Sequence, residues 1–116
     1  MTELNVIEGL RQELRRGSLV LAVLAQLRTE QFGYTLREAL WEIGIEIEEG
    51  PLYPMLRRLE TQGLLTSEWR EEGNRRKRFY VLSEAGRETL GVLQREWRGM
   101  NRALDRLLTE KKHAAA

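Results

Sequence analysis

The sequence contains no cysteine and a single histidine, His113, close to its end. Without cysteine the chain cannot form a disulfide framework, a thiol redox switch, or a cysteine-ligated zinc or iron–sulfur site. One histidine near the terminus cannot assemble a metal site alone, so we expect no metal and no other cofactor. No apolar run is as long as a transmembrane helix, and the charged N-terminal segment does not resemble a signal peptide. We therefore expect a cytoplasmic protein with no membrane partner.

The residue combinations of an active site are also missing. No histidine lies near a plausible nucleophile, no pair of carboxylates occupies a pocket-forming region, and no glycine-rich loop suits a phosphate group. We therefore predict that the protein is not an enzyme. The 116 residues, 41% of them hydrophobic, can bury the modest core of a small binding protein.

Residues 51–62 have the pattern of a short amphipathic helix that presents cations. Its apolar side consists of Leu52, Met55, Leu56 and Leu59. Its opposite side carries Pro54, Arg57, Arg58 and Thr61, with Tyr53 at the edge. Pro51 suits the first turn of such a helix, and Gly63 can end it in a left-handed conformation. The two arginines suit either a solvated face or a nucleic-acid contact, and Arg58 can instead pair with a nearby glutamate.

Two β-compatible segments, residues 65–70 and 78–82, follow this helix. Residues 71–77 between them contain the turn-forming pair Gly73 and Asn74 and then the three cations Arg75, Arg76 and Lys77. The sequence therefore predicts a β-hairpin with a basic tip, and one residue of the Phe79–Tyr80 pair should enter the core. A cationic helix followed by a cationic hairpin suits a phosphate-lined groove, as in a winged helix-turn-helix.

The apolar spacing upstream predicts a helix over residues 3–15 and a more apolar helix over 18–28. Gly17 can bend the chain between them, or the two can merge into one helix. Thr35 and Glu38 have the spacing of a capping box, which predicts a helix from residue 35 to about residue 43. Helix 35–43, the connection 44–50 and helix 51–62 would then form the helix-turn-helix.

The net charge of +1 hides an uneven distribution. Residues 35–50 hold one arginine against five glutamates, whereas residues 51–82 hold seven basic residues against four acidic ones. The acidic segment should weaken non-specific binding and leave the basic helix and hairpin as the favoured contact surfaces for DNA.

The C-terminal segment predicts a dimer seam. Ser83 can cap a helix of about 25 residues, which carries a stripe with spacings of 3, 4, 3, 4 and 3: Leu90, Leu93, Trp97, Met100, Leu104 and Leu107. A small domain does not need so long a stripe to pack on itself. About three heptads are marginal alone, so we expect the helix 3–15, through Leu4, Ile7 and Leu10, to wrap against the partner.

The motifs together resemble one family, the PadR-like transcriptional regulators. The resemblance spans roughly residues 14 to 108 and rests on residues 14–19, 32–34, 50–54, Leu56, 58–60, 63–64, Trp69, 75–77, Tyr80, Leu82 and 84–86. The family often has serine or threonine where this chain has Pro51, which supplies neither a hydroxyl nor an N–H. The resemblance implies a dimeric DNA-binding regulator of the shorter type with one C-terminal helix.

Some relatives bind flat aromatic compounds between tryptophans of the two subunits, and Trp97 looks like that position. The resemblance thus implies an effector site at Trp97 and Met100, while plain interface packing is the alternative. The sequence leaves open whether an effector exists.

We therefore predict a mainly α-helical protein with a small β-hairpin wing: a winged helix-turn-helix over residues 1–82 and a dimerisation helix over 83–113. Residues 114–116 are interpreted as a remnant of the expression vector. The predicted function is a homodimeric repressor of a palindromic DNA operator. The predicted DNA contacts are Tyr34, Thr35, Tyr53, Pro54, Arg57, Arg58, Thr61, Asn74, Arg75, Arg76 and Lys77. A protein–protein interaction module that uses the heptad helix without binding DNA stays open as the alternative.

Overall fold

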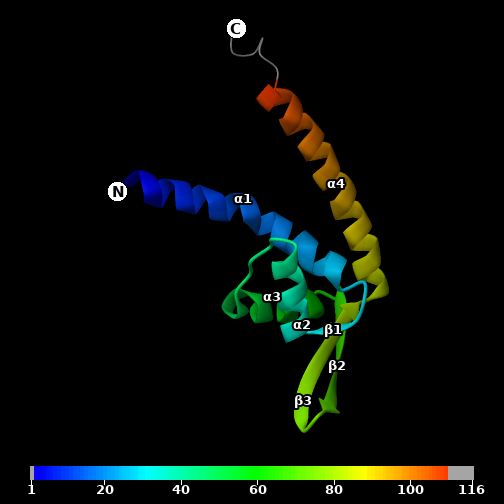
Figure 1. Cartoon of the computed structure of the whole chain (residues 1–116). Helices are drawn as coiled ribbons and strands as arrows, with labels where there is room; N and C mark the ends of the chain where they lie inside the picture. The colour runs from blue at the N-terminus through cyan, green and yellow to red at the C-terminus, as the bar shows by residue number, and fades with distance from the viewer. Residues whose placement is uncertain (1, 110–116) are drawn as a thin grey trace.

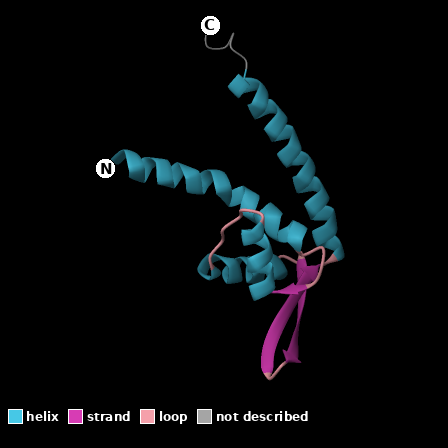
Figure 2. Cartoon of the chain, viewed as in Figure 1, coloured by secondary structure: helices cyan, strands magenta, loops and turns pink. Residues whose placement is uncertain are grey.

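A computed structural model describes residues 2–109, which form helices and a small antiparallel sheet (Figures 1 and 2). The elements in chain order are α1 (Thr2–Gln26), β1 (Gln31–Phe32), α2 (Gly33–Glu42), α3 (Glu49–Thr61), β2 (Leu65–Glu72), β3 (Arg75–Leu82) and α4 (Glu84–Thr109). This arrangement confirms the predicted fold class, mainly α with a β-hairpin wing. Residues 110–113 of the predicted dimerisation helix and residues 114–116 lie outside the described residues.

Helix α1 is continuous, so the alternative of one merged helix is correct and Gly17 does not interrupt it. A glycine inside a helix costs only about 1 kcal/mol relative to alanine and does not break it. A Cβ at Gly17 would touch nothing within 4 Å, so no close approach of another segment requires glycine at this point. The second half of α1 enters the core through Val23 and Leu24, and Leu27 follows directly after the helix; all three are fully buried.

The sheet has the order β1-β3-β2, and the hairpin of β2 and β3 forms the wing. Gly73 and Asn74 both have positive φ, 53° and 67°, as a two-residue type I′ turn requires. The hairpin is confirmed, but its strands are longer than expected, and residues 75–77 belong to β3 rather than to the tip. Glu71 faces Arg76 across the strands and Glu72 faces Arg75, and such opposite charges favour extended pairing.

Two helix starts differ from the sequence-based expectation. Helix α2 begins at Gly33, so the capping box is wrong: Thr35 Oγ1 donates a hydrogen bond to the Phe32 carbonyl at 3.0 Å from inside the first turn. The reason is tertiary, because β1 pairs with β3 through Phe32 and the helix starts where this pairing stops. Helix α3 also begins two residues early, at Glu49.

The ends of the helices follow the sequence more closely. Gly63 has φ 83°, and the N–H groups of Gly63 and Leu64 bond to the carbonyls of Glu60 and Leu59 at 2.9 and 3.0 Å. This is the Schellman arrangement that a glycine after the C-cap favours. Ser83 caps α4, as predicted, by accepting a hydrogen bond from the Gly86 N–H at 3.0 Å.

The core lies where α1, α2, α3, the sheet and the start of α4 meet. Its members include Leu24, Leu27, Leu36, Leu40, Leu52, Leu56, Leu65, Leu82 and Leu90. Tyr80 belongs to the core cluster, as expected of one residue of the pair, and Phe79 is buried outside that cluster, where Phe32 packs edge-on against it. Because α3 and the wing both contribute residues to this core, they pack together as one body.

The first half of α1 and the second half of α4 leave this body in diverging directions (Figure 1). The radius of gyration is 17.6 Å, against about 13 Å for a compact chain of this length. We call residues 3–17 of α1 and 94–109 of α4 the arms. Most of their side chains are exposed.

Candidate nucleic-acid interface

Helix α3 has the two faces that its sequence predicts. Leu52, Met55, Leu56 and Leu59 are buried, and the opposite side exposes Pro54, Arg57, Arg58 and Thr61. Tyr53 is half-buried at the edge, and its ring lies against the backbone of Gly33, where a Cβ would overlap it. Glycine at this position therefore lets the start of α2 approach the outer edge of α3.

A hollow of about 340 Å³ separates α3 from the wing. It is lined by Phe32, Gly33, Tyr34, Tyr53, Arg57, Trp69, Arg76, Lys77, Arg78 and Tyr80. The lining contains four cations and no carboxylate, so the hollow favours an anion. Segments more than forty residues apart in the sequence meet at this hollow. They bring together five of the predicted DNA contacts: Tyr34, Tyr53, Arg57, Arg76 and Lys77.

Two of the three tyrosines at this hollow, Tyr34 and Tyr80, have a raised pKa. Burial raises the pKa of Tyr80, and the Glu38 carboxylate beside Tyr34 raises the pKa of that hydroxyl. Both shifts move the groups further from ionisation at neutral pH. Tyr34 is exposed at the start of α2, whereas the hydroxyl hydrogen of Thr35 is already donated to Phe32.

The cations of the wing differ in how firmly they are held. Arg75 is exposed beside the turn, and the Arg76 guanidinium lies 5.0 Å from the centre of the Trp69 ring. Lys77 is held more closely, with Nζ 3.5 Å from a Glu72 oxygen and 4.4 Å from the centre of the Phe32 ring. Asn74 occupies the turn itself. The basic surface thus extends along β3 instead of ending at the tip.

Arg57 and Arg58 line different cavities although they are neighbours in the sequence. Arg57 faces the hollow beside the wing, and Arg58 lines a groove of about 530 Å³ between α3 and α1. The suggested pairing of Arg58 with a glutamate is not among the ion pairs of residues 2–109. Pro54 lines the groove as well, whereas Tyr53 lines the hollow.

The sequence analysis missed a polar cluster that joins α3 to the wing. Arg78 Nη2 donates to Glu60 Oε1 at 2.9 Å, Arg78 Nε donates to Ser67 Oγ at 2.9 Å, and Ser67 Oγ donates to Glu60 Oε2 at 2.7 Å. We call these three residues the clasp. The Arg78 guanidinium also lies 5.5 Å from the ring centre of Trp69, which is directly opposite it on β2. Strand register could have suggested the Trp69–Arg78 pair, but nothing local indicates Glu60.

The arms expose most of the residues predicted for the dimer seam. The exposed members are Leu4, Ile7, Leu10, Trp97, Met100, Leu104 and Leu107. Leu93 is partly buried against the core, and Leu90 is 8% exposed within it. Leu90 therefore packs on its own chain, because α4 first crosses the core before it leaves the body. The sequence analysis had not included Val6, Leu14 and Leu108 among its seam residues, and all three are exposed on the same arms.

The described part of the chain, residues 2–109, contains no group of three or more histidine, cysteine, aspartate or glutamate side chains that could hold a metal ion. None of its helices is both long and apolar enough to span a membrane.

A short helix with an exposed cationic face, set beside a two-stranded wing with a cationic hollow between them, defines a winged helix-turn-helix DNA-binding protein. Residues 20–92 match the profile of the Transcriptional regulator PadR-like family. The chain belongs to this family and is a transcriptional regulator.

Individual relatives agree with this assignment. The chain is 38% identical over 80 residues to the transcriptional regulator Rv3488 of Mycobacterium tuberculosis, covering 68% of this chain and 75% of the relative. A crystal structure of a PadR family transcriptional regulator from Eggerthella lenta has a TM-score of 0.87 at 38% identity, covering 96% of this chain and 99% of the other. A PadR-like transcription factor from Bacteroides fragilis has a TM-score of 0.72 at 27% identity, covering 85% and 98%.

Proposed function

We propose that this regulator is a homodimeric repressor that binds a palindromic DNA operator. The observation that carries the proposal is the cationic hollow between α3 and the wing, because Arg57, Arg76 and Lys77 line it and would attract a backbone phosphate. Helix α3 would then enter the major groove, and the wing would lie along the adjacent backbone. A dimer seated on promoter DNA excludes polymerase by occupancy, which is the reason for proposing repression.

The arms support the dimer. Their exposed apolar side chains include Met100 at 60% and Leu104 at 47% on α4, and Leu4 at 71% on α1. Contiguous apolar surface of this extent favours association with a second copy of the same stripe. The twofold axis would pass between the α4 helices, and each α1 arm would cover part of the partner's α4.

The experiment that tests this function is selection of bound duplexes from random DNA. We expect an inverted repeat whose half-sites are separated by about one helical turn, or a multiple of it, since the twofold axis repeats the recognition helix. Footprinting should then show two protected half-sites. Recovery of no common sequence would refute sequence-specific binding.

The competing function is a protein–protein interaction module that uses the α4 stripe without DNA. Absence of DNA binding would favour this alternative. A DNA affinity that does not change with salt concentration would also favour it, because phosphate contacts release counterions. A dimer that forms normally but binds no DNA would therefore support it.

We also propose that Trp97 and Met100 form an effector site across the twofold axis. Trp97 is 43% exposed on the α4 arm, and Met100 lies one turn further on the same stripe. Two copies of Trp97 facing each other would hold a planar aromatic or cationic compound by stacking. Such a ligand would change DNA affinity only if it binds one separation of the recognition helices better than another.

A further inference from the structure

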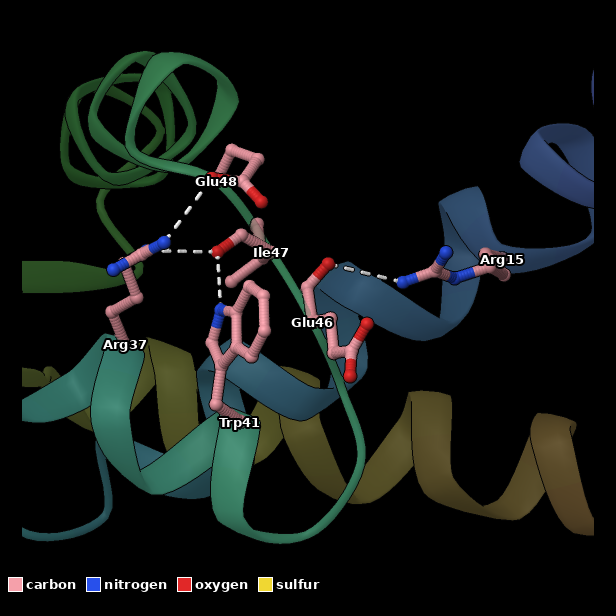
Figure 3. Close-up of polar contacts among 6 residues, drawn as sticks. All are labelled: Arg15, Arg37, Trp41, Glu46, Ile47 and Glu48. Atoms are coloured by element: carbon pink, nitrogen blue, oxygen red, sulfur yellow. Dashed lines mark hydrogen bonds and ion pairs between the residues drawn. The ribbon is translucent and has the colours of Figure 1, made fainter.

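In the connection between α2 and α3, the carbonyl group of Ile47 accepts hydrogen bonds from two side chains. The Trp41 indole Nε1–H donates to this oxygen at 2.7 Å, and the Arg37 Nε–H donates to the same oxygen at 3.0 Å (Figure 3). The carbonyl therefore uses both of its lone pairs on side chains of α2. Figure 3 shows the two donors approaching it from α2.

The rest of the connection is restrained around this point. The Ile47 side chain is 2% exposed and belongs to the core, so the residue is held by its side chain as well as by its carbonyl. Arg37 Nη2 lies 3.1 Å from Glu48 Oε1, and the Arg37 guanidinium lies 5.2 Å from the Trp41 ring centre. Arg15 of α1 adds a hydrogen bond to the Glu46 carbonyl at 3.2 Å. The segment thus has fixed contacts with both neighbouring helices.

Recognition helix α3 begins at Glu49, two residues after Ile47. Its N-cap residue, Glu48, makes no capping hydrogen bond with its side chain. Contacts made before the helix starts therefore add to its buried face in holding the direction of α3. The polar contacts nearest that point are the Arg37–Glu48 ion pair and the two hydrogen bonds donated to the Ile47 carbonyl.

We propose that Arg37 and Trp41 are positioning residues, which fix the start of the recognition helix for DNA binding through the Ile47 carbonyl. This inference rests on the proposed DNA-binding function. Neither residue needs to touch DNA for the effect. Without these hydrogen bonds the connection would sample more conformations in the free protein, and binding would have to order it again, so affinity for the operator would fall.

The first test is Trp41→Phe, which keeps an aromatic ring under the Arg37 guanidinium and removes the indole N–H. Operator affinity should fall about threefold to tenfold, the effect of losing one net hydrogen bond. Affinity for a random-sequence duplex should not change, because phosphate attraction does not require a fixed direction of α3. The measurement is fluorescence anisotropy of labelled duplexes, made well below the melting temperature of the variant.

The second test is Arg37→Met, compared with Glu48→Gln. Arg37→Met removes the donor to Ile47, whereas Glu48→Gln weakens the ion pair and keeps that donor. We expect loss of operator affinity with Arg37→Met and little change with Glu48→Gln. The slope of affinity against salt should remain that of the wild type, whereas loss of a phosphate contact would lower it by about one unit.

Ile43→Ala provides a matched control, since Ile43 is exposed just before the connection and makes no contact with the Ile47 carbonyl. Its operator affinity should equal that of the wild type. Hydrogen exchange of the first-turn amides of α3 should accelerate in Trp41→Phe and stay unchanged in Ile43→Ala.

Two outcomes would overturn the proposal. One is a folded Trp41→Phe or Arg37→Met variant with unchanged operator affinity and unchanged exchange in α3. The other is a parallel loss on operator and random DNA, which would indicate a general weakening. If the wild-type protein itself selects no DNA sequence, the proposed function fails first, and the exchange measurement still decides whether these residues order α3.

Discussion

Glu60 and Arg78 join the last turn of α3 to the middle of the wing through a hydrogen-bonded ion pair of 2.9 Å. Both side chains are largely shielded, at 27% and 33% exposed, and Ser67 bonds to each of them. The wing therefore has a polar attachment to α3 in addition to the shared core. The orientation of the wing relative to α3 should therefore depend on the clasp.

Arg78→Met should lower the free energy of unfolding by about 1–3 kcal/mol, because it leaves Glu60 and Ser67 without their shared partner. Arg75→Met, on the exposed part of the same strand, should change it by less than about 0.5 kcal/mol. Urea denaturation measures both values. Equal stability of the two variants would contradict a structural role of the clasp.

The cationic residues can be tested by their salt dependence. Arg57→Ala, Arg75→Ala and Lys77→Ala should each weaken DNA binding and lower the salt slope by about one unit, since each side chain displaces counterions from phosphate. Arg57→Ala should also relax base preference, whereas the wing variants should lose affinity uniformly. Binding isotherms at several salt concentrations decide this. Unchanged slopes in all three would remove the proposed interface.

The dimer seam can be tested at Leu104. Leu104→Glu should place a charge in the interface and dissociate the dimer, which sedimentation velocity would detect. Arg102→Glu puts the same side chain on the opposite face of α4 and should leave the dimer intact. DNA affinity should fall with dissociation, because separate monomers lose the effective concentration of the second half-site. An intact Leu104→Glu dimer would refute the seam.

The effector proposal predicts that a planar cationic dye quenches tryptophan fluorescence by stacking at Trp97. Trp41 and Trp69 contribute to the signal, so the comparison needs Trp97→Ala, in which specific quenching should disappear while the dimer persists. The dye should also shift operator affinity, because coupling between two ligands is reciprocal. Equal quenching of both proteins would leave Trp97 as interface packing alone.

The Glu68 carboxylate predicts a dependence of stability on pH. The Arg70 hydrogen bond, and then the Arg70 charge, lower the pKa of Glu68 below its ordinary value of 4.5. The unfolded chain therefore binds the proton more readily, so this contribution to stability is present above about pH 4.5 and is lost as the pH falls through the folded-state pKa. Urea midpoints of the wild type and Glu68→Gln should converge at low pH. A difference that does not change with pH would contradict the assignment.

Structural features that depend only on neighbouring residues could be predicted from the local sequence. The apolar spacing of α3 predicts which side of it is buried, Gly63 predicts its left-handed end, and Gly73 with Asn74 predicts the turn of the wing. Each of these depends on backbone conformation or helical periodicity within a few residues. The motifs of residues 14–108 likewise suffice for the family.

Contacts between distant segments determined the remaining features. The pairing of Phe32 with Phe79 sets the start of α2 and overrides the local signal at Thr35. Arg78 bonds to Glu60, which lies eighteen residues earlier in the sequence. Helix α3 packs so that Arg57 and Arg58 line different cavities. Hydrogen bonds and burial between such segments depend on the packing of the whole core, which no local pattern encodes. The sequence therefore identified the parts of a DNA-binding regulator, and the tertiary structure determined how the recognition helix is held.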